Sequence, residues 1–109
     1  MDRIPAGGNV VDGRPVDAAD MMAALTAAEF VFDDGATQSF TADGRTTYVD
    51  AGVPSTGEWS VTGDGTFASF WPPTYRATYT VQWIVEDGLP VGVSFTDARS
   101  GARFNGRYR

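Results

Sequence analysis

Residues 75–96 read YRATYTVQWIVEDGLPVGVSFT, and they have the alternation of a β-hairpin. From Tyr75 to Val85, apolar and aromatic side chains occupy every second position, and the other face carries Arg76, Thr78, Thr80 and Gln82. Asp87-Gly88 follows shortly afterwards, a pair that tolerates the positive φ angles of a tight turn. The alternation resumes beyond this turn. Because successive side chains of a strand face opposite sides, the stretch predicts two antiparallel strands with one buried face.

The same turn signal recurs upstream, at Asp34-Gly35, Asp43-Gly44 and Asp64-Gly65. Pro72-Pro73 marks a further strand end, since proline cannot donate a hydrogen bond to a β-ladder. Between these signals the chain is rich in valine, threonine and aromatic residues, which suit a pleated surface. We therefore predict eight strands, each one hairpin away from the next, over residues 30–32, 36–41, 45–50, 57–62, 66–71, 75–85, 89–96 and 102–108.

One helix is predicted, over residues 17–28. Asp17 fits the N-cap position, and Asp20 resembles the acidic partner of a capping box, with a shorter side chain. Helical spacing places four apolar residues on one face, which we expect to close one end of a barrel or to cover a sheet; they are Met21, Met22, Leu25 and Ala28.

The expected architecture is mainly β, an antiparallel up-and-down meander that closes into an eight-stranded barrel with one N-terminal helix. Closure removes the exposed strand edges that such a meander would otherwise have. Residues 1–16 lack periodicity and are predicted to form a flexible N-terminal arm, with contacts through Val10 and Val11. Residues 17–109 are predicted to form the single domain. A barrel of this size holds either packed side chains or one small ligand.

Composition excludes several classes of function. The net charge is -6, and such a surface repels phosphate, so we expect no nucleic-acid or membrane partner. The chain has no Cys and no His, which removes thiolate chemistry, the Ser-His-Asp triad and the commonest transition-metal ligand. Asp33, Asp34 and Asp43 do not have the spacing of an EF-hand, and we expect neither a metal nor a cofactor. The first residues do not read as a signal peptide, so a cytoplasmic location is predicted.

Several short motifs resemble the calycin-type, lipocalin-like barrels of the MoaF and phenolic acid decarboxylase group. The motifs follow one another in the order of that group, as an aromatic pair, an Asp-Gly turn, a Gly-x-Trp strand and a Tyr-x-Val-x-Trp strand. In this chain they are Glu29-Phe-Val-Phe-Asp-Asp-Gly35, Asp43-Gly-Arg-Thr-Thr-Tyr48, Gly57-Glu-Trp-Ser-Val61 and Tyr79-Thr-Val-Gln-Trp83. The resemblance implies a barrel of about eight strands around a central cavity, often as a homodimer.

The decarboxylase chemistry of that group is not implied. Its pattern has two tyrosines where this chain has Phe30 and Phe32. It has an arginine where this chain has Glu58, and a glutamate where this chain has Val85. The carboxylate of an aromatic acid would therefore meet the Glu58 carboxylate where the decarboxylases have an arginine.

Glu58 is the candidate catalytic residue. The resemblance points it into the barrel, where an apolar cavity would raise the pKa of its carboxyl and suit it to acid or base work. In the alternative, Trp59 points inward and Glu58 is solvated, since neighbouring strand residues face opposite ways.

Aromatic residues are the candidate ligand-binding set. They could line an apolar cavity with phenol hydroxyls as anchors, or they could fill the core completely. The predicted set is Phe30, Phe32, Tyr48, Phe70, Tyr79, Trp83 and Phe95.

Arg103, Arg107 and Arg109 could together bind an anionic ligand, but an exposed polar face paired with acidic residues is the favoured interpretation. The leading hypothesis is that the barrel binds a small apolar or aromatic molecule. One alternative is an isomerase, cyclase or lyase that uses Glu58 and a tyrosine. Another is a non-catalytic domain with a filled core that dimerises.

Overall fold

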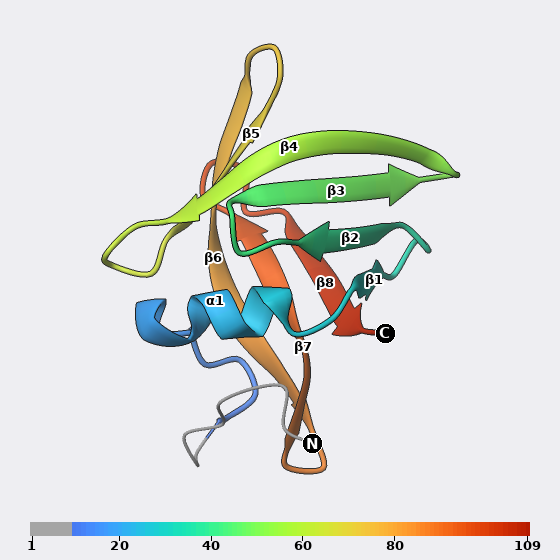
Figure 1. Cartoon of the computed structure of the whole chain (residues 1–109). Helices are drawn as coiled ribbons and strands as arrows, with labels where there is room; N and C mark the ends of the chain where they lie inside the picture. Colours follow the sequence, from blue (N-terminus) through green and yellow to red (C-terminus); the bar gives the residue numbers. More distant parts are fainter. Residues whose placement is uncertain (1–9) are drawn as a thin grey trace.

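The computed structural model describes residues 10–109. It contains one helix, α1 (Ala18–Thr26), followed by eight strands (Figure 1). The strands are β1 (Phe30–Phe32), β2 (Thr37–Phe40), β3 (Arg45–Asp50), β4 (Val53–Val61), β5 (Phe67–Trp71), β6 (Tyr75–Glu86), β7 (Leu89–Asp97) and β8 (Arg103–Tyr108).

The eight strands form a closed antiparallel barrel in which every strand pairs with its neighbours in the sequence. Strand β1 closes the barrel, because it pairs with β2 on one side and with β8 on the other. In the β1–β8 pair, Val31 lies opposite Arg107. The predicted fold class, an up-and-down barrel with one helix near the N-terminus, is confirmed. The barrel is also consistent with a calycin-like architecture.

The turns are of two kinds, although Asp-Gly occurs in both. In the β1–β2, β2–β3 and β4–β5 connections, a three-residue loop ends on a glycine with positive φ, at Gly35, Gly44 and Gly65. In the two-residue β6–β7 turn, both Asp87 and Gly88 have positive φ. Only this last turn therefore uses the Asp-Gly pair as the sequence analysis expected, while the other three belong to the longer hairpin type.

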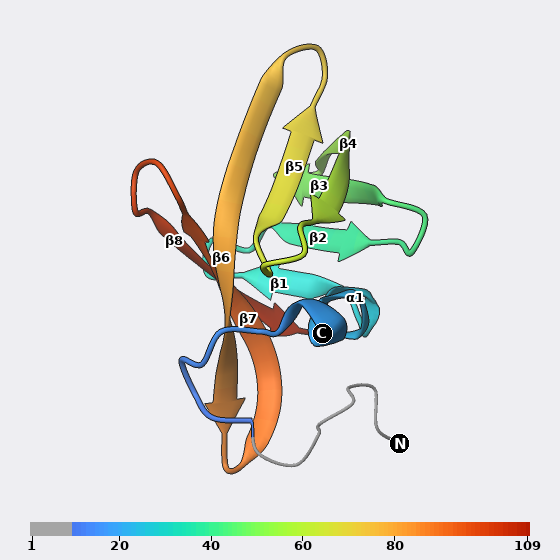
Figure 2. The same cartoon turned by 90° about the vertical axis from the view of Figure 1, so that its left-hand side faces the viewer.

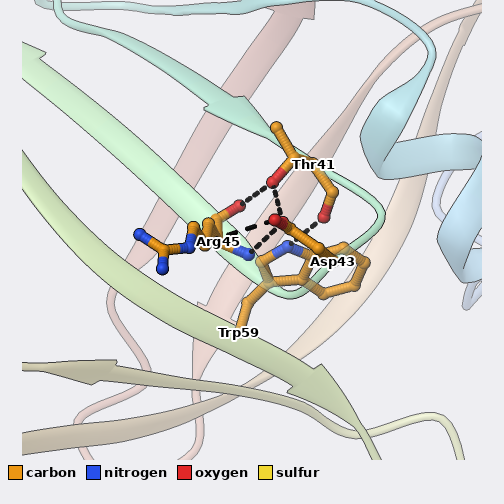
Figure 3. A network of polar contacts seen from close by, with 4 residues as sticks. All are labelled: Thr41, Asp43, Arg45 and Trp59. Carbon is orange, nitrogen blue, oxygen red and sulfur yellow. Dashed lines mark hydrogen bonds and ion pairs between the residues drawn. The ribbon is translucent and has the colours of Figure 1, made fainter.

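A network of side-chain contacts fixes the loop between β2 and β3 (Figure 3). The Thr41 hydroxyl donates to the Asp43 carboxylate, which in turn accepts from the backbone N–H of Arg45. The indole Nε1 of Trp59 donates to the carbonyl oxygen of Thr41 at 3.0 Å. This hydrogen bond joins the loop to β4, so the buried indole keeps a partner.

The helix α1 packs against the barrel through Met21, Ala24 and Leu25, all of which are fully buried. Part of the sequence prediction is wrong here. Met22 is 46% exposed, and Ala24 takes the place expected for it on the buried face. Asp17 is the N-cap, but its side chain makes no capping hydrogen bond, and the first turn is closed by the Asp17 carbonyl oxygen, which accepts from the N–H of Asp20.

The segment before α1 lies along β6 (Figure 2). The N–H of Gly13 donates to the carbonyl of Trp83, and the N–H of Trp83 donates to the carbonyl of Arg14, each at 2.8 Å. Since β5 pairs with β6 only as far as Tyr79, this segment occupies the edge of β6 that β5 leaves open. Residues 1–9 of the predicted arm lie outside the described residues. Of the two valines expected to make contacts, Val10 packs on the core and Val11 is exposed.

Side chains fill the helix end of the barrel. A single buried cluster joins α1, the segment before it and the inner faces of six strands. Its members are Val16, Met21, Ala24, Leu25, Phe30, Phe40, Trp59, Phe67, Val81, Trp83, Val93 and Phe95. The inner face of β6 follows the predicted alternation, with Val81 and Trp83 buried in this cluster.

Candidate functional site

A cavity of about 430 Å³ lies in the barrel end away from α1, and eight of its fourteen lining residues are aromatic. Its size falls in the range of small-molecule sites in proteins. The lining residues are Phe32, Asp33, Asp34, Gln38, Phe40, Tyr48, Phe67, Ser69, Trp71, Tyr79, Phe95, Arg103, Phe104 and Asn105. The barrel is thus packed at one end and hollow at the other.

Three phenylalanines form the floor of the cavity, because they belong both to its lining and to the buried core. The rings of Phe67 and Phe95 have centroids 5.4 Å apart, and Phe40 lies 5.7 Å from Phe67. Such ring contacts stabilise a core beyond the apolar area they bury, so the floor is well supported.

The walls of the cavity are built from larger side chains nearer its mouth. The Tyr48 ring lies 6.2 Å from Phe32 and 6.5 Å from Trp71, between centroids. Across the cavity, Tyr79 contacts Phe104 at 6.4 Å. A ligand that enters would therefore meet ring faces and edges on most sides.

Glycines make room for these rings. A Cβ atom added to Gly57 would lie 2.6 Å from the Trp71 ring, so this ring rests directly on the backbone of β4. On β8, a Cβ atom at Gly106 would come within 3.2 Å of both Phe30 and Phe32. The glycine of the Gly-x-Trp motif therefore positions Trp71, which the sequence analysis did not assign to the site.

The structure brings four of the seven predicted ligand-binding residues to the cavity: Phe32, Tyr48, Tyr79 and Phe95. The others lie elsewhere. Phe30 and Trp83 are buried in the core at the helix end. Phe70 lies outside the cavity, with the Arg76 guanidinium 4.3 Å from its ring centroid. The strand alternation explains this, since Ser69 and Trp71, its neighbours on β5, both face the cavity.

Glu58 does not line the cavity. Its side chain is exposed, whereas its neighbour Trp59 is 6% exposed and belongs to the core. Of the two orientations weighed from the sequence, the structure has Trp59 inside, and the expectation of an inward Glu58 is wrong. The physical reason is the pleat of β4, which turns Gly57 and Trp59 inward together.

The polar side chains of the cavity differ in how well they are satisfied. Gln38 Nε2 donates to the Thr46 hydroxyl at 2.9 Å, and Thr46 donates onward to the carbonyl oxygen of Ser39 at 2.8 Å. Ser69 is 6% exposed, and its hydroxyl has no hydrogen-bond partner of normal geometry among the described residues. The Ser69 hydroxyl interacts weakly with the Tyr79 phenol and lowers the pKa of that group slightly.

Both tyrosines of the cavity carry protonated phenols at neutral pH. Burial raises the pKa of Tyr79, with smaller contributions from Tyr75 and Asp97. Burial also raises the pKa of Tyr48, and the nearby Asp34 and Asp50 add to the effect. Each phenol is therefore available as a hydrogen-bond donor.

Charged residues lie at the mouth of the cavity. Asp33, Asp34 and Arg103 are part of the lining, and all three are exposed. The other two arginines of the C-terminal run form ion pairs, Arg107 with Glu86 at 2.6 Å and Arg109 with Glu29 at 3.0 Å. The three arginines thus do not converge on one site, in keeping with the favoured interpretation from the sequence.

Comparison of the chain with family models, with characterised proteins and with solved structures gave no match. Within residues 10–109, no three acidic side chains gather as a metal site would require. Over the same residues, the chain's helix lacks the length and apolar character needed to cross a membrane. The candidate site therefore has to be interpreted from its own geometry.

Proposed function

We propose that the barrel binds a small, partly apolar molecule, such as an aromatic compound, in the cavity opposite α1. One observation carries this proposal: the cavity of about 430 Å³ is lined by rings from seven of the eight strands and has a buried aromatic floor. A core built only for stability would fill this space, since protein interiors are close-packed.

The enzyme hypothesis loses the residue on which it was built, because the Glu58 side chain is exposed and lies outside the cavity. Ligand binding, unlike catalysis, does not require an acid or base in the cavity. Apolar walls supply affinity through the area they remove from water, and a few polar groups fix orientation.

The test uses N-phenyl-1-naphthylamine, an uncharged dye whose emission rises in apolar surroundings. We expect saturable binding with one dye per barrel. Tyr48→Ala removes part of the wall and should weaken binding several-fold. Tyr75→Ala is the matched control, because Tyr75 is 55% exposed and lies outside the cavity, and it should bind the dye as the unchanged protein does.

Amide chemical shifts of the unchanged protein provide a second readout, which needs no variant and therefore does not depend on whether a variant folds. The dye should shift the amides of Ser69, Trp71 and Tyr79, and leave those of α1 in place. An emission change that does not saturate, or shifts confined to the outer surface, would refute the proposal.

A further inference from the structure

The Ser69 hydroxyl is the one buried side-chain polar atom of residues 10–109 that has no hydrogen bond of normal geometry, although it lies close enough to the Tyr79 phenol to lower the pKa of that group slightly. It lies on the inner face of β5, between the inward-facing Phe67 and Trp71, and it is part of the cavity lining. A buried hydroxyl without a partner costs free energy, so its presence in an apolar cavity calls for an explanation.

Other buried polar groups nearby do not share this property. Thr46 both accepts from Gln38 and donates to Ser39, and so its hydroxyl is used within the protein. The Ser69 hydroxyl makes no hydrogen bond of normal geometry, and its interaction within the protein is the weak one with the Tyr79 phenol, so its donor and acceptor capacity is not fully used. An alanine would pack equally well at this position and would carry no unsatisfied group.

We infer that Ser69 is the polar anchor of the cavity, and that it selects an uncharged aromatic molecule with a hydroxyl or carbonyl group at its inner end. This inference rests on the proposed function. The ring of the ligand would lie against Phe67, Phe95 and Trp71, and its oxygen would exchange a hydrogen bond with Ser69.

The charges around the cavity argue for a neutral ligand. No cation lines its interior: Arg103, the arginine of the lining, is exposed, and Asp33 and Asp34 share the mouth with it. An anion that reached Ser69 would have to leave water without a buried counter-charge, which is costly. A neutral hydroxyl or carbonyl loses much less hydration on entry.

Three naphthalenes of nearly equal size test the inference, each by displacement of N-phenyl-1-naphthylamine. They are 2-naphthol, 2-methylnaphthalene and 2-naphthoate. Ser69→Ala should weaken 2-naphthol by about fivefold, the value of one net hydrogen bond, and leave 2-methylnaphthalene unchanged or slightly tighter. 2-Naphthoate should bind at least about tenfold more weakly than 2-naphthol to the unchanged protein.

Ser60→Ala is the matched control, since Ser60 is exposed on β4 and lies outside the cavity. It should leave the affinities for all three compounds as they are. In the free protein, Ser69→Ala should also raise the midpoint of thermal unfolding, because it removes an unsatisfied buried group. A serine with a structural hydrogen bond would give the opposite shift.

The outcomes separate the inference from the function beneath it. One outcome is that the dye binds while Ser69→Ala leaves the ratio of the 2-naphthol and 2-methylnaphthalene affinities unchanged. In that case Ser69 is not an anchor and a water molecule satisfies its hydroxyl, so the inference fails while the proposed function stands. Equal or tighter binding of 2-naphthoate refutes the neutral-ligand claim. If the dye itself does not bind, both the function and the inference fail.

Discussion

Asp43 and Asp64 occupy equivalent positions in two three-residue loops. Each carboxylate accepts a hydrogen bond from the threonine two residues before it, Thr41 or Thr62. This contact is the main cause that lowers the pKa of each aspartate below its ordinary value of 3.8, and backbone N–H groups of the loop contribute as well. These two aspartates therefore have a structural role in the turns in addition to their contribution to the negative net charge.

Thr41→Val should raise the pKa of Asp43 toward 3.8, because it removes the largest contribution that lowers it. A carboxyl with a depressed pKa stabilises the fold above about pH 4, and this stabilisation is lost as the pH falls through its folded-state pKa. The variant should therefore lose less stability on acidification. The measurement is an NMR titration of the side-chain carboxyl, with Asp64 as the internal control; a shift at both aspartates would contradict the local origin.

Gly57→Ala should destabilise the barrel by about 1–3 kcal/mol, as overpacking of a core does. Its Cβ would lie 2.6 Å from the Trp71 ring and 2.7 Å from the Phe70 carbonyl oxygen, so the ring would have to move. Denaturant unfolding measures the loss, and dye binding should fall because Trp71 lines the cavity. Gly63→Ala is the control, since its Cβ would meet nothing within 4 Å. Equal stability of the two variants would contradict the packing described at Gly57.

At the scale of elements, the strand pattern could be predicted nearly completely from the sequence. Alternation and turn residues placed all eight strands, because one face of each strand is buried and the other is not. The start of β4 was missed by four residues, since Val53-Pro54-Ser55-Thr56 contains a proline. These residues pair with β3 on one side and have no β5 partner on the other, which is where a proline is tolerated.

The lining of the cavity was only partly predictable, and β5 shows why. Both faces of this strand carry aromatic residues, so hydrophobicity alone could not distinguish Phe70 from Trp71. A signal was present nonetheless, since Phe67 and Trp71 share one face and Phe70 faces the other way. Ser69 gave no sequence signal, because its importance comes from what surrounds it in space.

The β3–β4 turn contains a strained residue. Ala51 has a φ of 51° in a two-residue turn before Gly52, a backbone conformation that alanine rarely adopts. Ala51→Asn should stabilise the protein by about 1 kcal/mol, because Asn-Gly is favoured in such turns. Thermal unfolding measures the gain. Ala42→Asn is the control in a loop position without positive φ, and an equal gain there would contradict relief of strain as the cause.

At the scale of the whole molecule, stability and binding reside in opposite ends of the barrel. The end that α1 closes holds most of the buried cluster, and the far end holds the cavity. Homodimerisation, which the resemblance implied, stays a prediction to be tested by sedimentation.

Leu25→Ala should destabilise the protein by about 2–4 kcal/mol, because Leu25 is fully buried on the face of α1 that packs against the barrel. It should leave dye affinity unchanged under conditions where the variant is folded. Phe104→Ala should do the reverse, since Phe104 is 47% exposed and lines the cavity. Denaturant unfolding and dye titration on both variants provide the measurement. Parallel losses of stability and affinity in each variant would contradict the separation of the two ends.

The backbone pairing of Gly13 and Arg14 with Trp83 is relevant to aggregation. An uncovered strand edge is a template for intermolecular β-sheet and so for aggregation. Past Tyr79, β6 continues beyond its partner β5, and the segment before α1 shields that part of its edge. Substitutions at the exposed residues 11–15 of this segment thus bear on colloidal behaviour and yield, even though these residues belong neither to the cavity lining nor to the buried cluster.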